Sequence, residues 1–209
     1  GHTGIRVVDK ANDMDIVFNY GTFDFATQGF YFKFARGLLP YQLSCSEFRR
    51  FLSSYIYDER SVYSQTLNLD SIQKQYLMDL LFENYQPANR EYLYNFLYDN
   101  CSTRVRDIIE KSTNNQITWI AQPSRKSFWN LLDEYLSRFP WIQWGIHTIL
   151  GSPATSVATI REQMFLPDYL MYHLDSAAYN GVPLVQPIET VYEAPEQDLS
   201  TPWYFSPFF

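Results

Sequence analysis

Hydrophobic and polar positions follow two different periods along this chain. Alternation with a period of two predicts a hairpin at residues 2–25, with its turn at residues 9–13, and further strands at residues 29–35, 41–44, 60–67 and 184–192. Apolar residues at helical spacing predict helices at residues 47–57, 71–83, 127–139, 141–150, 159–165 and 168–178. Together these elements predict one α+β domain over residues 1–209, with a C-terminal helical region at about residues 127–178.

The helix at residues 71–83 has a clear start signal, because Asp70 is a residue type that caps helix N-termini. Its apolar side chains predict the buried face. These are Ile72, Tyr76, Leu77, Leu80 and Leu81.

The stretch from Tyr92 to Ile109 places a lone cysteine at the start of another helix. Val105, Ile108 and Ile109 follow Cys101 at the spacing of one helical face, which predicts a helix at about residues 100–111. We expect Asp99, Asn100 or Ser102 to cap the N-terminus of this helix. In the first turn, free N–H groups and the helix dipole favour thiolate over thiol, and Arg104 and Arg106 add positive charge.

Two other roles for Cys101 remain open at this point. It is also the kind of small apolar residue that ends a buried stripe. A disulfide with Cys45, the second cysteine of the chain, would abolish thiol chemistry.

A base for Cys101 is available at the open end of the predicted hairpin. His2 falls opposite Asn19 or Tyr20 there, and we favour Asn19, whose amide can fix the orientation and tautomer of the imidazole. Tyr20 and Asp24 are the alternative orienting residues. An isolated histidine at a strand end is commonly solvent-exposed, and an asparagine before Gly21 is commonly a turn residue.

Composition excludes several classes of function. The net charge of −7 and the pI near 4.9 argue against a nucleic-acid partner. No spacing of cysteines and histidines indicates a metal or another cofactor, and no apolar run is long enough to cross a bilayer. Aromatic residues make up 18% of the chain, which suits an apolar ligand. The start at Gly1-His2, without a signal peptide, predicts that the natural protein has further sequence upstream.

Four separated motifs carry a resemblance to a known family: GHTGIRV, NYGTFDF, YNFLYDNCSTRVRD and MFLPDYL. In these the chain resembles the periplasmic domain of Lnb, the Bacteroidetes-type lipoprotein N-acyltransferase family, formerly a domain of unknown function. More distantly, the order His, polar residue, Cys resembles circularly permuted NlpC-type papain-like proteins, including lecithin-retinol acyltransferase. The resemblance implies a permuted papain-like core in which an antiparallel sheet packs against the cysteine-bearing helix.

The resemblance also implies roles for individual residues. Cys101 corresponds to the nucleophile, His2 to the base and Asn19 to the orienting residue. We add a substrate-binding set near them, with Tyr20 as an oxyanion donor beside the Cys101 backbone N–H. This set is Tyr20, Asn100 and Arg104.

The activity that follows is transfer of a fatty acyl chain from a phospholipid, through a thioester, to the N-terminal amine of a lipoprotein. The expected setting is a soluble periplasmic domain that meets the membrane surface through a missing or separate segment, since Lnb-type proteins continue into membrane-spanning helices. The alternatives are an NlpC-type cysteine amidase acting on cell-wall peptides, and a non-catalytic lipid- or protein-binding module.

Overall fold

The computed structural model describes residues 1–23, 40–120 and 125–195. It divides into two compact units. The sheet unit comprises Gly1–Ile120 and Met164–Ala194, and the helical unit comprises Ala121–Gln163 and Pro195–Phe209. The strand expected at residues 29–35 and the alternative orienting residue Asp24 lie outside the described residues. That residues 1–209 act as one catalytic domain stays a prediction.

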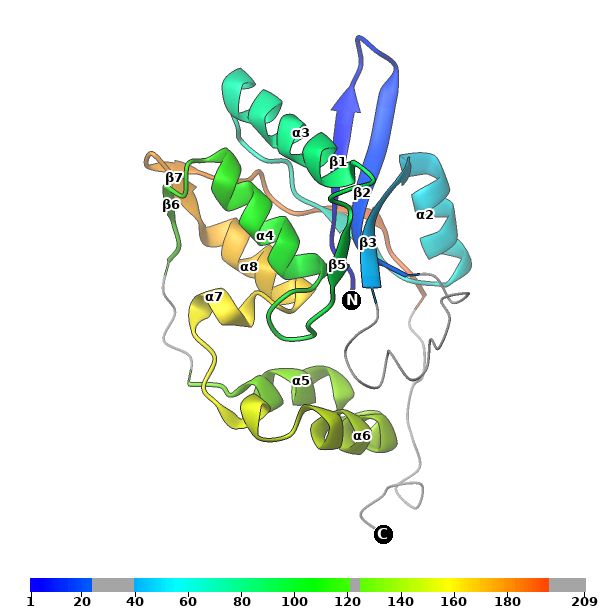
Figure 1. Cartoon of the computed structure of the whole chain (residues 1–209), viewed down its shortest axis with the longest axis vertical. Coiled ribbons are helices and arrows are strands. Elements are labelled where there is room, and N and C mark those ends of the chain that lie inside the picture. Colours follow the sequence, from blue (N-terminus) through cyan, green and yellow to red (C-terminus); the bar gives the residue numbers. More distant parts are fainter. Residues whose placement is uncertain (24–39, 121–124, 196–209) are drawn as a thin grey trace. The chain divides into compact units, whose positions relative to one another are not determined.

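A four-stranded antiparallel sheet organises the sheet unit (Figure 1). Its spatial order is β1 (Gly4–Asp9), β2 (Met14–Thr22), β3 (Pro40–Glu47) and β5 (Glu91–Leu93). The predicted hairpin is confirmed, with a register that runs from Gly4 opposite Asn19 to Asp9 opposite Met14. Strand β5 was not expected, because three residues are too few to show a period.

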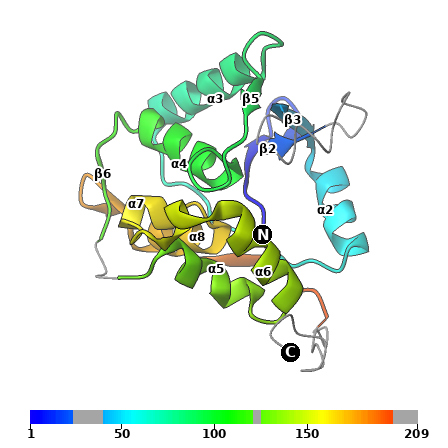
Figure 2. The same cartoon turned by 60° about the horizontal axis from the view of Figure 1, so that its bottom comes forward.

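Helices cover both faces of this sheet (Figures 1 and 2). α3 (Ser71–Tyr85) lies against the face from which Phe18 contacts the rings of Phe82 and Tyr85. α4 (Cys101–Ser112) lies on the same side and contacts β1 and β2. The opposite face carries α2 (Phe48–Tyr57), where the Arg6 guanidinium lies 3.4 Å above the Phe48 ring. The sheet therefore packs against the cysteine-bearing helix, whereas the permuted papain-like topology stays a prediction.

The buried face of α3 differs from the expected one. Asp70 caps the helix, as predicted, and Leu77 and Leu81 are buried, but Ile72 is 81% exposed and Tyr76 is 43% exposed. The apolar residues of α3 are distributed around all sides of the helix, so their spacing does not indicate which side is buried. Polar residues also occupy the inner face, because Gln73 returns to the Asp70 backbone in a capping box and Asn84 reaches the hydroxyl of Tyr20.

The rest of the sheet unit is built from short pairings. β4 (Val62–Ser64) pairs with β9 (Glu189–Tyr192), and β7 (Ala178–Tyr179) lies between β6 (Ile117–Thr118) and β8 (Val182–Pro183). The strands expected at residues 60–67 and 184–192 are thus shorter than predicted, and the β4–β9 ladder shifts register between Val62 and Tyr63. α8 (Pro167–Ser176) starts at a proline, which suits the first turn of a helix.

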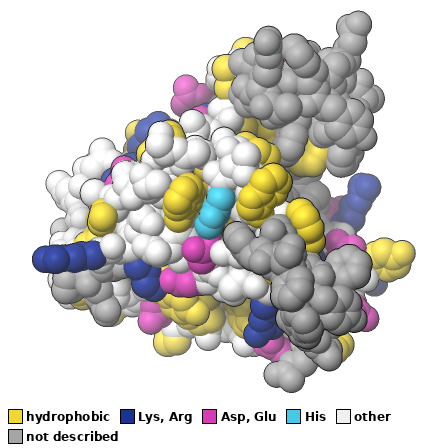
Figure 3. Space-filling view, turned by 90° about the horizontal axis from the view of Figure 1, so that it is seen from below, with side chains coloured by type: hydrophobic (Ala, Val, Ile, Leu, Met, Phe, Trp, Pro, Cys, Tyr) yellow, Lys and Arg dark blue, Asp and Glu magenta, His cyan; other side chains and the backbone are white. Residues whose placement is uncertain are grey.

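The helical unit contains α5 (Phe128–Leu136), α6 (Pro140–Leu150), the short 3₁₀-helix η1 (Ser152–Thr155) and α7 (Ile160–Gln163). Ser127 caps α5, which ends at Leu136 rather than at the expected residue 139, and Pro140 is itself the first residue of α6. Phe128, Leu131 and Leu132 form the buried face of α5. Other hydrophobic side chains reach the surface, as on the face drawn in Figure 3. Across the described ranges, no helix combines the length and hydropathy needed to cross a membrane.

Candidate functional site

Asn100 fixes the start of the helix that bears Cys101. Its side-chain oxygen accepts hydrogen bonds from the backbone N–H groups of Ser102 and Thr103, at 2.9 and 3.0 Å. Its amide nitrogen donates to the carbonyl oxygens of Phe96 and Phe165, at 2.8 and 2.9 Å. Of the three caps considered, Asn100 is therefore the one used, and Cys101 is the first helical residue. Since Asn100 is buried and bonded within the protein, its visible task is to position α4; a role in substrate binding stays a prediction.

His2 is held by Asn19 across the end of the hairpin. Its Nε2 lies 3.3 Å from Asn19 Oδ1, so the expected contact is present. The expected register is wrong by two residues, because Gly4 and not His2 lies opposite Asn19, and His2 reaches Asn19 diagonally. Gly4 makes room for this contact, because a Cβ there would lie only 2.9 Å from the same oxygen. If Nε2 carries the hydrogen donated to Asn19, the neutral ring keeps its lone pair on Nδ1.

Burial lowers the pKa of His2 below its ordinary value, and the positive charge of Arg60 acts in the same direction. The hydrogen bond to Asn19 opposes this by raising the pKa. The net effect favours the neutral imidazole, which is the form that can accept a proton.

Two contacts bring the segment of His2 to the segment of Cys101. The hydroxyls of Thr3 and Ser102, the residues that follow His2 and Cys101, are hydrogen-bonded at 2.8 Å. Gly21, two residues after Asn19, has a positive φ of 87°, and a Cβ built on it would lie 3.6 Å from Cys101 Cβ. The predicted base, orienting residue and nucleophile thus belong to segments that meet at one end of the main sheet (Figures 1 and 2).

Tyrosines that the sequence did not single out surround Cys101. Burial raises the pKa values of Tyr55, Tyr92 and Tyr94, and negative charge on Cys101 raises each of them further. All three therefore stay neutral phenols. The hydroxyl of Tyr92 is buried and has no hydrogen-bond partner within the described part of the chain. A Cβ built on Gly21, which would lie close to Cys101, would also lie 3.9 Å from the Tyr92 hydroxyl.

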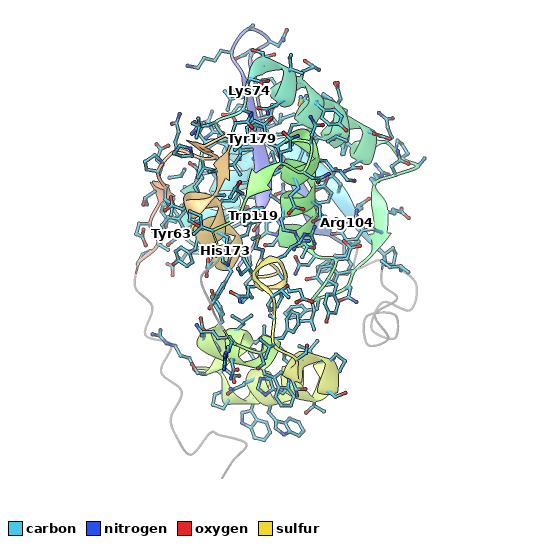
Figure 4. All side chains as sticks on the ribbon, turned by 90° about the vertical axis from the view of Figure 1, so that its left-hand side faces the viewer. Tyr63, Lys74, Arg104, Trp119, His173 and Tyr179 are labelled. Atoms are coloured by element: carbon cyan, nitrogen blue, oxygen red, sulfur yellow. The ribbon has the colours of Figure 1, made fainter. Side chains whose placement is uncertain are left out.

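Arg104 and Tyr20, two of the expected substrate-binding residues, are engaged within the protein. Arg104 on α4 (Figure 4) forms a two-point ion pair with Asp99, at 2.6 and 2.8 Å, and its guanidinium lies 3.6 Å above the Tyr92 ring. Tyr20 is 1% exposed, and its hydroxyl accepts a hydrogen bond of 2.8 Å from Asn84. Their assignment to substrate binding stays a prediction, and the unpartnered phenol at this site is that of Tyr92.

The two segments that meet here bring a thiol, Cys101, and an imidazole, His2, to the same end of the sheet. Cys45 and Cys101 are both free, so the alternative of a disulfide between them is not realised. Within the described ranges, no group of three or more His, Cys, Asp or Glu side chains could hold a metal ion.

The comparison with family models agrees with three of the four motifs that carry the resemblance, since MFLPDYL at residues 164–170 lies beyond its match. The family model described as the Lnb N-terminal periplasmic domain matches residues 1–134, which include His2, Asn19 and Cys101. Searches of curated proteins and of solved structures gave no match. Because the family model covers more than half of the 209 residues, the chain belongs to the Lnb N-terminal periplasmic domain family.

Proposed function

We propose that this chain is a cysteine acyltransferase that moves a fatty acyl chain from a phospholipid to the N-terminal amine of a lipoprotein. The observation that carries the proposal is the convergence of two distant segments. His2 is held by Asn19, and the Thr3–Ser102 hydrogen bond brings its segment to the start of α4. Membership of the Lnb family supplies the lipoprotein context.

In the first half-reaction Cys101 Sγ would attack the ester carbonyl carbon of the phospholipid while Nδ1 of His2 takes the thiol proton. Collapse of the tetrahedral intermediate breaks the carbon–oxygen bond. His2 returns the proton to the departing oxygen, which leaves a lysophospholipid and a thioester on Cys101.

In the second half-reaction the amine of the acceptor attacks the thioester carbon. The carbon–sulfur bond breaks, an amide forms, and the proton lost by the amine passes through His2 to the sulfur. Cys101 and His2 then have the protonation states with which they began.

Tyr92 is the side chain we assign to the oxyanion in both half-reactions. A phenol that is neutral, buried and unpartnered within the described residues donates well to developing negative charge, because no existing hydrogen bond has to break first. Tyr20 stays the alternative donor, because its hydroxyl accepts from Asn84 and keeps its own hydrogen, but it is 1% exposed.

The test is detection of the thioester by mass spectrometry of the intact protein, after incubation with a phospholipid of known acyl chains dispersed in detergent. We expect one acyl increment that hydroxylamine removes, present in the wild type and in Cys45→Ser and absent from Cys101→Ser. Cleavage of a peptidoglycan peptide without any acyl increment would favour the amidase. A protein inert to both substrates would favour the binding module.

A further inference from the structure

We infer that Arg104 is a positioning residue for acyl transfer, whose guanidinium holds the ring of Tyr92 and strengthens its phenol as a hydrogen-bond donor. The inference rests on the proposed function, in which the Tyr92 hydroxyl donates to the oxyanion. It gives Arg104 a task that needs no contact with substrate. Substrate binding by Arg104, which the sequence predicts, becomes the alternative outcome of the test.

The contact between Arg104 and Tyr92 is direct. The central carbon of the guanidinium, Cζ, lies 3.6 Å from the centroid of the Tyr92 ring. A cation over an aromatic face at this distance is attracted by the negative charge of the π system. The same Cζ lies 6.0 Å from the centroid of the Tyr20 ring, so Tyr92 is the closer of the two tyrosines.

Asp99 fixes the guanidinium in this place. Nε and Nη2 of Arg104 donate to the two carboxylate oxygens of Asp99, at 2.6 and 2.8 Å. Asp99 is in turn held by backbone hydrogen bonds with Asn95 in both directions, at 2.9 and 3.0 Å. A two-point pair sets the plane of a guanidinium as well as its distance. An anionic substrate group would therefore compete with Asp99 for Arg104.

The ring that Arg104 covers is otherwise held by aromatic neighbours. Tyr92 is buried, and its ring lies 6.5 Å from that of Tyr20 and 6.4 Å from that of Tyr41, between centroids. Its hydroxyl has no hydrogen-bond partner in the described part of the chain. The charge of Arg104 thus acts on a confined phenol whose donor is available.

The charges around Tyr92 favour a neutral but strong donor. Burial has the largest effect on the pKa of Tyr92 and raises it, so the phenol keeps its proton. Arg104 lowers this pKa by more than the Asp99 carboxylate raises it, so the positive member of the ion pair has the greater influence on Tyr92. A phenol whose proton is made more acidic, yet is retained, donates a stronger hydrogen bond to an oxyanion.

The experiment measures acylation of Cys101 by p-nitrophenyl butyrate, followed by release of p-nitrophenol. Arg104→Gln removes the charge and should slow the maximum rate about tenfold while KM stays unchanged, because the interaction serves the transition state. Arg6→Gln is the matched control and should react at the wild-type rate. Arg6 also forms a two-point pair, with Asp15, and covers the ring of Phe48, but on the face of the sheet opposite α4.

A double-mutant cycle tests whether Arg104 acts through the phenol. Tyr92→Phe keeps the ring and removes the donor, so adding Arg104→Gln to it should cause no further loss of rate. Should Arg104→Gln not fold, Arg104→Lys takes its place in the cycle. Lysine keeps a cation but loses the planar fork, and we expect a smaller loss of rate that again disappears in Tyr92→Phe.

The possible outcomes are distinct. A raised KM at an unchanged maximum rate would assign Arg104 to substrate binding. The same loss with and without the Tyr92 hydroxyl, or an equal loss in Arg6→Gln, would overturn the inference. A protein that reacts with the ester but forms no thioester from a phospholipid would refute the proposed donor and leave the role of Arg104 standing. A wild type whose Cys101 does not react with the ester would overturn both.

Discussion

Thr3 and Ser102 share a hydrogen bond of 2.8 Å between hydroxyls that lie 99 residues apart in sequence. Ser102 is fully buried, so this contact ties the start of the chain to the first turn of α4 from within the protein. Each hydroxyl belongs to the residue directly after a proposed catalytic one. The pair therefore controls how the segment of His2 meets the segment of Cys101.

Thr3→Val should reduce both stability and turnover. It leaves the buried Ser102 hydroxyl without this partner, which costs about 1–3 kcal/mol in the free energy of unfolding. Denaturant unfolding measures the first effect, and thioester formation measures the second. Thr22→Val is the control, because it removes a similar contact between hydroxyls, that of Thr22 with Ser44 at 2.7 Å. Ser44, unlike Ser102, is not adjacent to Cys101 in the sequence. Equal loss of turnover in both variants would contradict a specific role for Thr3.

Asn19→Ala should lower the rate and move its pH dependence. The hydrogen bond that His2 donates to the Asn19 amide oxygen raises the pKa of His2, so removing this acceptor lets that pKa fall further. His2 acts as a base in its neutral form, and the acidic limb of the pH profile of kcat/KM should therefore shift to lower pH. The maximum rate should drop about 10- to 100-fold as the ring loses its orientation. An unchanged acidic limb in a folded variant would show that His2 is not the titrating base.

Tyr92→Phe and Tyr20→Phe form a matched pair with opposite expected effects. The Tyr92 hydroxyl has no partner in the described residues, so its loss should spare stability but slow thioester formation about 10- to 100-fold if it serves the oxyanion. Tyr20→Phe breaks the hydrogen bond from Asn84 and should cost about 1 kcal/mol of stability, with a smaller effect on rate. The reverse ranking of the two rates would return the oxyanion role to Tyr20.

Thiol alkylation should distinguish the two cysteines. Burial raises the pKa of Cys45, which reduces its thiolate fraction at any pH below that value. Cys101 is the first residue of α4, on the segment that meets the segment of His2, the proposed base. We expect Cys101 to react first with iodoacetamide near neutral pH, as followed by peptide mass spectrometry, and Cys45→Ser to react at the wild-type rate. Faster labelling of Cys45 would weigh against a nucleophilic Cys101.

Local signals predicted the parts of the site that depend on neighbouring residues. The cap residues placed Cys101 in the first turn of a helix, because capping acts over a few positions. The hairpin and the contact between His2 and Asn19 were also predicted, but the register was wrong by two residues, since Gly4 lies opposite Asn19. The contacts between segments that are distant in sequence left no such signal in the spacing of residues. Neither the Thr3–Ser102 contact nor the unpartnered Tyr92 hydroxyl could be read from spacing, since each depends on how β1, β5 and α4 pack.

The same limit explains the errors in element bounds. The helical period at residues 71–83 located α3 correctly but not its inward side, because Gln73 is buried there while Ile72 is exposed. Strand β5 is held by pairing with β3 rather than by its own composition. Alternation within three residues could not have indicated it.

The Asn100 hydrogen bond to Phe165 has a consequence for how the protein can be divided experimentally. Phe165 lies beyond residue 134, where the family match ends, and so does β9, the partner of β4. A fragment ending at residue 134 would leave an amide N–H of the buried helix cap without its acceptor and would expose the edge of β4. The homologous segment and the smallest independently folding piece are therefore different lengths of chain, and expression trials should keep residues 164–194 with the segment that bears Cys101.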